Sequence, residues 1–137
     1  MAIELVHLCD ASLTLSGPMA IPDTPLGNRM IFGVDHGELE GERLKGTFKA
    51  GGAAGDWVTL DARGIGTLDV RATLETHDGA LILTTYRGRI DLKAGTMYIA
   101  PLYDTGDERY LWLNSIQAVG KGSLDGIELT YEIYEMR

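Results

Sequence analysis

Cysteine is almost absent from this sequence, since Cys9 is the only one among 137 residues. A single cysteine excludes an internal disulfide and any metal site built from several thiolates, and it is compatible with a reducing cytoplasm. No apolar run approaches the roughly 18 residues that span a bilayer, and the stretch from Met1 to Glu4 is unlike the start of a signal peptide. We therefore expect a cytoplasmic protein without a membrane partner.

Positive charge is scarce as well. The chain has 12 lysines and arginines against 20 aspartates and glutamates, so its net charge at pH 7 is −8. A surface this negative repels phosphate backbones, and no cluster of basic residues offsets it, so we expect no nucleic-acid partner. The apolar fraction of 45% and the charged fraction of 23% are typical of a globular chain. The length predicts a single domain, residues 1–137, with a core of its own.

Helical periodicity is also missing, because no window of ten or more residues repeats its apolar positions every 3.6 residues. Eighteen glycines separate short segments that are rich in Val, Ile, Leu, Thr and Tyr. This spacing predicts an all-β chain, a single antiparallel barrel of about eight or nine strands. The expected strands are residues 3–15, 29–34, 38–48, 58–61, 68–76, 80–87, 95–102, 110–120 and 127–135.

Two parts of this pattern carry more detail. In the first expected strand the odd positions are apolar except His7, which predicts one buried face and makes His7 a candidate core histidine. The segment 17–27 contains three prolines and is expected to be a loop or a strap.

The dipeptide Asp78-Gly79 is typical of a two-residue type I′ hairpin turn. With that turn, Arg71 lies opposite Tyr86, and the other face of the hairpin carries Leu68, Val70, Ala72, Leu74, Leu81, Leu83 and Thr85. Arg71 shares its face of the strand with Asp69, Thr73 and Glu75, and such a polar face is typical of one turned to solvent. The pair of Arg71 and Tyr86 is flanked by apolar Ile82, which favours the barrel interior instead, and we expect the interior.

The sequence resembles the domain of unknown function 3237 family. The resemblance covers nearly the whole chain and rests on residues 27–29, 37–41, 46, 51–52, 56–57, 68–76, 78–80, 87–88, 110–114, 119–120 and 131–135. It implies a calycin-like antiparallel β-barrel, and it implies no settled activity for the family. Where the family pattern has a second acidic residue before the hairpin turn, this chain has His77.

Motifs that would bind a cofactor are lacking. The glycine-rich stretch 50–55 is followed by Asp56, which repels phosphate, and not by the lysine and helix of a phosphate loop. The three histidines, His7, His36 and His77, do not have the spacing of metal ligands. Cys9 has no basic neighbour and is expected to be a small buried hydrophobe. The sequence therefore predicts no metal and no organic cofactor.

The residues left for chemistry are polar or aromatic, and we expect them to line an interior cavity. Arg71, Tyr86 and Asp56 are the candidate catalytic residues, with Tyr86 or Asp56 as acid or base and Arg71 stabilising an oxyanion. The candidate ligand-binding residues are Arg29, Trp57, Trp112 and Asn114, the last two on one face of a single strand.

Two function classes fit this set of residues. One is a cofactor-independent enzyme, of the isomerase, cyclase, hydratase or lyase type, acting on a hydrophobic carbonyl-bearing or phenolic metabolite. The alternative is a non-catalytic carrier or sensor for a similar small hydrophobic ligand, and a protein that only binds other proteins is a more distant third. We also expect the chain to be able to form a homo-oligomer, because Tyr131, Ile133 and Tyr134 offer apolar surface.

Overall fold

The computed structural model describes residues 1–137, and it describes the burial of every residue except Gly52. The chain is all-β, as predicted, and every strand pairing is antiparallel. Its elements are β1 (Leu5–Thr24), β2 (Gly27–Glu40), β3 (Gly46–Phe48), the 3-10 helix η1 (Gly51–Ala53), β4 (Ala54–Leu60), β5 (Ile65–Thr76), β6 (Leu81–Asp91), β7 (Thr96–Ile99), β8 (Leu102–Asp104), the 3-10 helix η2 (Glu108–Ser115), β9 (Gln117–Asp125) and β10 (Glu128–Met136). Over the described residues there is no α-helix, and no helix is long and apolar enough to cross a membrane.

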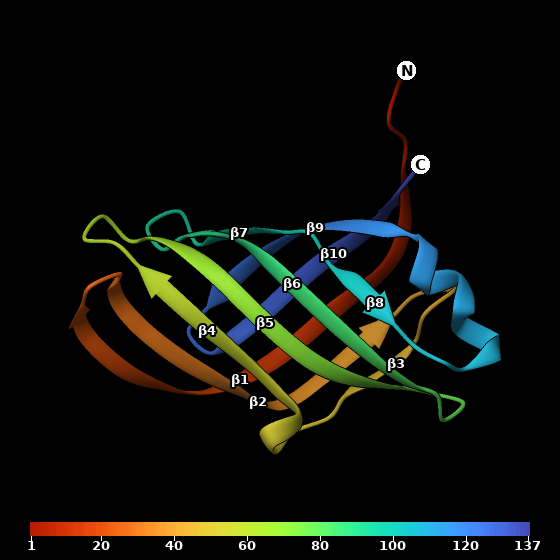
Figure 1. Cartoon of the computed structure of the whole chain (residues 1–137), viewed down its shortest axis with the longest axis horizontal. Helices are drawn as coiled ribbons and strands as arrows, with labels where there is room; N and C mark the ends of the chain where they lie inside the picture. Colours follow the sequence, from red (N-terminus) through yellow and green to blue (C-terminus); the bar gives the residue numbers. More distant parts are fainter.

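Eight of the strands form a closed ring. The hydrogen-bonded order is β5–β4–β2–β1–β10–β9–β7–β6, and pairing of β6 with β5 closes the ring (Figure 1). The short strand β3 pairs with β2 and β5, and β8 pairs with β6. Closure leaves the eight strands with few free edges and encloses an interior space, which we call the lumen.

Alternation of side chains along the strands fills the lumen with apolar groups. In β1 the residues Cys9, Ala11, Leu13 and Leu15 are buried, as their odd positions predict. His7 is an exception, because a register shift between His7 and Cys9 turns Leu8 into the core and leaves His7 outside. The ring nitrogen Nε2 of His7 lies 2.8 Å from Oδ1 of Asp10, and both side chains are exposed. The expected core histidine is therefore a surface residue.

The proline-containing segment 17–27 is not the loop that its composition predicts. It is the outer part of a long hairpin in which β1 continues to Thr24 and pairs with β2, for example at Met19 and Ile31. On its other side β1 pairs with β10 only as far as Thr14. The extension of β1 is therefore an edge, where prolines are tolerated because their missing N–H is not needed for pairing.

The register of the β5–β6 hairpin also differs from the prediction. Thr76 N–H donates to the carbonyl of Ala80 over 2.9 Å, and Gly79 has a φ of +90°, so the turn has three residues and not two. Arg71 consequently pairs with Thr85, while Tyr86 pairs with Val70. A shift of one residue exchanges the two faces of a strand. Tyr86 therefore lies inside on the face of Val70 and not of Arg71, with 7% of its surface exposed, and Leu81 and Leu83 lie outside, 57% and 43% exposed.

The predicted strand 110–120 is a strand only in its second half. Its first half is η2, whose N-cap residue Asp107 accepts a hydrogen bond from the backbone N–H of Arg109 over 3.0 Å. Tyr110 and Leu113 are buried, and η2 covers one end of the ring (Figure 1). The β1–β2, β4–β5, β6–β7 and β9–β10 turns gather at the opposite end, which we call the mouth of the lumen.

Two of the three residues expected to offer apolar surface for self-association are buried. Tyr131 and Ile133 point into the core, where 3% and 4% of their surfaces are exposed, so they offer no apolar outer face. Tyr134 packs edge-on against the ring of His7, with 5.6 Å between the ring centres.

Candidate functional site

One carboxyl group lies among the apolar side chains of the lumen. Asp56 is on β4, and pairing places it in one inward row with Phe32 of β2, Val70 of β5 and Tyr86 of β6. Its neighbours along β4 on the same face, Ala54, Val58 and Leu60, are all buried. Alternation along β4 thus turns the one charged residue of the strand inward together with its apolar neighbours.

Two small cavities meet at Asp56. The one nearer the mouth has a volume of about 30 Å³ and is lined by Leu15, Met30, Phe32, Asp56, Val58, Leu60, Leu68, Ile90, Leu92, Met97, Leu124 and Leu129. The deeper cavity of about 20 Å³ is lined by both Asp56 and Tyr86. Each cavity has room for about one water molecule, so side chains fill most of the lumen.

Burial changes the acidity of Asp56. Removal of the carboxylate from water raises the pKa of Asp56 to about 6, although its Oδ1 accepts a hydrogen bond from the backbone N–H of Asp69 over 3.1 Å. The negative charge of Asp69 adds a smaller increase. Among the described residues the second oxygen, Oδ2, accepts no hydrogen bond from the protein. A carboxyl with this pKa exchanges its proton close to neutral pH.

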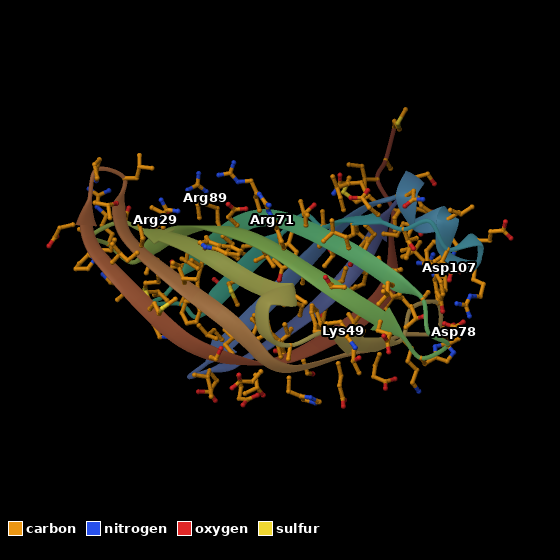
Figure 2. The ribbon with its side chains drawn as sticks, turned by 60° about the horizontal axis from the view of Figure 1, so that its bottom comes forward. Arg29, Lys49, Arg71, Asp78, Arg89 and Asp107 are labelled. Carbon is orange, nitrogen blue, oxygen red and sulfur yellow. The ribbon has the colours of Figure 1, made fainter. Side chains whose placement is uncertain are left out.

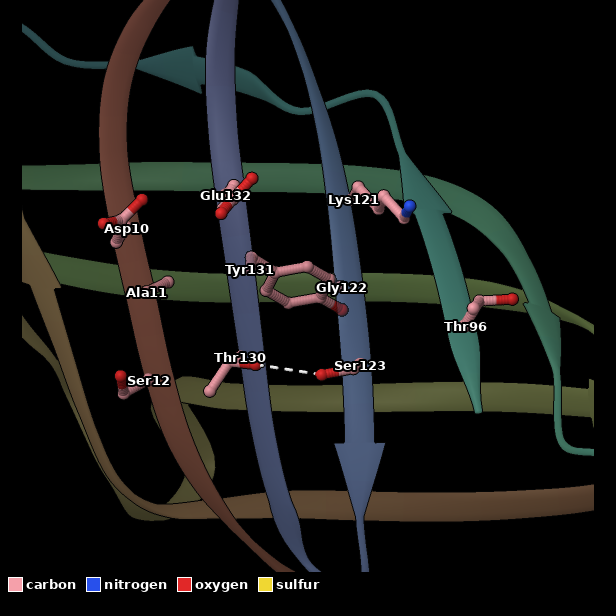
Figure 3. A pocket seen from close by; sticks show the side chains of 10 residues that line it. All are labelled: Asp10, Ala11, Ser12, Thr96, Lys121, Gly122, Ser123, Thr130, Tyr131 and Glu132. Atoms are coloured by element: carbon pink, nitrogen blue, oxygen red, sulfur yellow. Dashed lines mark hydrogen bonds between the residues drawn. The ribbon is translucent and has the colours of Figure 1, made fainter. Parts of the chain in front are cut away.

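Two tyrosines meet across the lumen beside Asp56. Tyr86 on β6 donates to the hydroxyl of Tyr131 on β10 over 3.4 Å, and their rings are edge to face at 5.9 Å. Burial raises the pKa of both phenols, so both are protonated at neutral pH. Tyr131 fits because it pairs with Gly122 of β9, where a β-carbon would lie 2.5 Å from its ring (Figure 3).

Two further buried groups lie deeper. Burial raises the pKa of the Cys9 thiol to about 12, with a smaller contribution from Asp10, so Cys9 is not a nucleophile at neutral pH. Tyr103 on β8 is buried as well, and burial raises its pKa. We did not predict Tyr103 or Tyr131 as site residues, although Tyr131 alternates with Leu129 and Ile133 in a way that indicates the inward face.

Three of the predicted site residues lie on the outside of the ring. Arg71 is exposed and pairs with Gly55 and Thr85, so the prediction that it faces the lumen is wrong. Arg29 and Trp57 alternate with the inward residues of β2 and β4 and therefore also point outward. Figure 2 shows Arg29 and Arg71 along the same outer side of the ring.

Trp112 and Asn114 lie neither in the lumen nor on the outer wall of the ring, because they belong to η2 and not to a strand. The ring of Trp112 lies 5.2 Å beneath the guanidinium of Arg43. The amide of Asn114 bonds both the N–H and the carbonyl of Thr105, each over 2.9 Å. Both side chains therefore hold the covered end together, and the structure brings only Asp56 and Tyr86 of the predicted set into the lumen.

Comparison with known proteins places the chain in a family. The model of a family described as "Protein of unknown function (DUF3237)" matches residues 3–136. This chain belongs to the DUF3237 family.

Relatives of this DUF3237 chain include the hydroalkoxylation enzyme phnH from Penicillium herquei, which is 36% identical over 118 residues, covering 85% of this chain and 72% of that protein. A β-barrel-like protein from Acinetobacter baumannii AYE has a similar structure, with a TM-score of 0.90 at 28% identity, over 100% of this chain and 98% of that chain. The structure of an enzyme from Penicillium herquei gives a TM-score of 0.74 at 25% identity, over 99% and 94% of the two chains.

The outer wall of this DUF3237 barrel has a concavity of its own. A trough of about 510 Å³ crosses β1, β10, β9 and β7, and its outward side chains are Asp10, Ser12, Thr96, Lys121, Ser123, Thr130 and Glu132 (Figure 3). These polar groups are open to water, which screens their charges. Among the described residues, no group of three His, Cys, Asp or Glu side chains lies close enough together to hold a metal ion.

The outward position of Arg71 leads to a first prediction. Replacing Arg71 by methionine should change the free energy of unfolding by no more than about 0.5 kcal/mol, because the described residues include no hydrogen-bond or ion partner for it. Urea unfolding of the purified variant measures this change. Arg43→Met is the matched control and should lose clearly more, because Arg43 donates to the buried Glu135 over 2.7 Å. Equal losses in the two variants would contradict the outward position.

Proposed function

We propose that this protein is an acid–base enzyme that acts on a small hydrophobic organic molecule in the lumen, with Asp56 as the proton donor. The observation that carries this proposal is the position of Asp56, a carboxyl among apolar side chains with a pKa of about 6. Asp56 is half-buried, and its carboxyl is largely removed from water. A carboxyl in such a position lowers stability whenever it ionises, so a purely structural role would be served better by an apolar residue. Groups with such shifted pKa values are typical of active sites.

The name of the relative phnH suggests a reaction that fits this acid. Hydroalkoxylation adds the O–H of an alcohol or a phenol across a carbon–carbon double bond. In the proposed sequence the protonated Asp56 gives its proton to one alkene carbon, which forms a C–H bond. The hydroxyl oxygen then bonds to the other carbon, and its proton returns to the carboxylate of Asp56. The atoms balance without an oxidant, a reductant or a cofactor.

The walls of the lumen limit the substrate class. Every residue lining the cavity near the mouth is apolar except Asp56, so the substrate should be hydrophobic, and a phenol or carbonyl compound with an alkene meets the requirements of the reaction. The cavity is smaller than such a molecule, so side chains at the mouth must move to admit it. Met30 and Leu92 line the cavity there, and Met30 is half-buried while Leu92 is exposed. The unbranched side chain of methionine repacks readily.

The experiment is a conversion assay on a phenol that carries a trisubstituted alkene in the ortho position, since protonation of such an alkene leaves a tertiary carbocation. We expect a cyclic ether of unchanged mass, and in D₂O one deuterium bonded to carbon. The rate should fall as the pH rises through about 6, because the acid must be protonated to react. Chromatography with mass spectrometry measures the product at each pH. A rate independent of pH between 5 and 8 would contradict Asp56 as the acid.

The same experiment tests the alternative, a carrier or sensor for the same ligand. The predominantly apolar cavity favours this alternative, because binding requires only fit and burial of apolar surface. A carrier would bind the phenol, as measured by calorimetry, and return it unchanged after prolonged incubation.

A further inference from the structure

Two hydroxyl groups inside the lumen have only weak hydrogen bonds. Tyr86 donates to Tyr131 over 3.4 Å, which is long for a bond between hydroxyls, since these are usually about 2.7–2.8 Å. Tyr131 in turn reaches only the sulfur of Met97, at 3.9 Å, and a thioether is a weak acceptor. Both tyrosines are more than nine-tenths buried. Buried hydroxyls usually have good partners, so this pair retains capacity for another one.

The pair is also well placed to meet a ligand. Tyr86 lines the deeper cavity together with Asp56, and Met97 lines the cavity near the mouth. Tyr131 lines neither cavity itself, but its hydroxyl contacts both of these residues. Asp56 and Tyr86 are in one inward row, two strands apart, which separates their backbones by about 9–10 Å. Val70 lies between them in this row, so a ligand atom that reaches both the carboxyl and the Tyr86 phenol must occupy the deeper cavity that these residues line.

We infer that Tyr131, supported by Tyr86, is an oxygen-binding subsite that selects an uncharged hydroxyl or carbonyl oxygen on the ligand. The inference rests on the proposed function and adds to it the chemical class of the ligand. In the proposed reaction the subsite would hold the oxygen nucleophile while Asp56 donates to the alkene. The two tyrosines are then positioning residues, and Asp56 alone is the proton donor.

The surroundings of the subsite exclude an anionic ligand. The residues that line the two cavities include no lysine, arginine or histidine, so a carboxylate would enter without a counter-ion. It would also meet the like charge of Asp56 whenever that group is ionised. Burial of an unpaired charge is costly, whereas a neutral phenol needs only one good hydrogen bond.

Three probes of similar size test the inference, namely phenol, toluene and benzoate. Their dissociation constants are measured by NMR titration at pH 5.5 and pH 7.5 with the wild-type protein, Tyr131→Phe and Tyr134→Phe. The last is the matched control, because Tyr134 lies on the same strand and its hydroxyl contacts Glu132 on the outside. We expect the wild type to bind phenol more tightly than toluene and to reject benzoate.

Tyr131→Phe should weaken phenol binding about three- to tenfold, the usual net effect of one hydrogen bond, and should leave toluene unchanged. Tyr134→Phe should behave like the wild type with all three probes. An equal loss for phenol and toluene, tighter binding of benzoate than of phenol, or no phenol binding at all would overturn the inference. The proposed function is tested separately, because Asp56→Asn should retain phenol binding while it loses turnover.

Discussion

Replacing Asp56 by asparagine is expected to lower the rate of conversion of the ortho-alkenyl phenol about a thousandfold. A positioned general acid contributes roughly a hundred- to ten-thousandfold to a rate, and an amide of the same shape has no acidic proton to give. Steady-state kinetics at pH 6 measures the loss. Asp69→Asn is the matched control, because it removes an exposed carboxylate on the outer wall but keeps the backbone N–H that bonds Asp56. Similar losses in both variants would contradict the assignment.

The same substitution should stabilise the protein at high pH. The pKa of Asp56 is raised from 3.8 to about 6 on folding, so the folded state holds its proton more tightly than the unfolded state. The stability associated with Asp56 is complete below about pH 4 and is lost as the pH rises through about 6, in total about 3 kcal/mol. Asp56→Asn does not ionise, so its advantage over the wild type should grow over that range and level off above about pH 7. Urea unfolding between pH 4 and 8 measures the difference, and an advantage that does not change with pH would contradict the raised pKa.

A large loss of stability is expected from a substitution at Gly88, where β6 pairs with β7. Gly88 pairs with Ile99, and a β-carbon there would lie far inside van der Waals contact with the backbone carbonyl of Tyr98. Gly88→Ala should therefore lower the free energy of unfolding by about 3 kcal/mol, at the upper end of the usual cost of overpacking, because only a shift of the strand can relieve a backbone contact.

Gly106→Ala is the control for this change, since nothing lies within 4 Å of the position that its β-carbon would take. Urea unfolding of the two variants beside the wild type measures the contrast. A stability of Gly88→Ala within 1 kcal/mol of the control would show that β6 and β7 separate at little cost.

The sequence predicts the fold where a local pattern decides it. Alternation from Cys9 to Leu15 identifies the buried face of β1, and the recurrent glycines and β-branched residues predict an all-β chain. The pattern fails where one residue of register decides the outcome. Asp78-Gly79 is compatible with turns of two or three residues. In the longer turn that the structure has, the Thr76 hydroxyl accepts from the N–H of Ala80 and donates to Asp78, and the resulting register turns Tyr86 inward and Arg71 outward.

The candidate site is predicted only in part for a related reason. Asp56 and Tyr86 are polar or aromatic residues of predicted strands or their borders, so the sequence identifies them. Tyr131 joins them through closure of the ring, which brings β10 opposite β6 although these strands are not neighbours. The pKa of Asp56 depends on the apolar residues contributed by several strands, and no local segment contains that information.

The position of η2 has a kinetic consequence. Because η2, with Tyr110 and Leu113 buried, covers one end of the ring, the proposed substrate would reach Asp56 from the opposite end, and the product would leave by the same route. Product and substrate then compete for one passage. Accumulated product should raise the apparent KM for substrate without changing the maximal rate, and a widened mouth should speed release and uptake to the same degree.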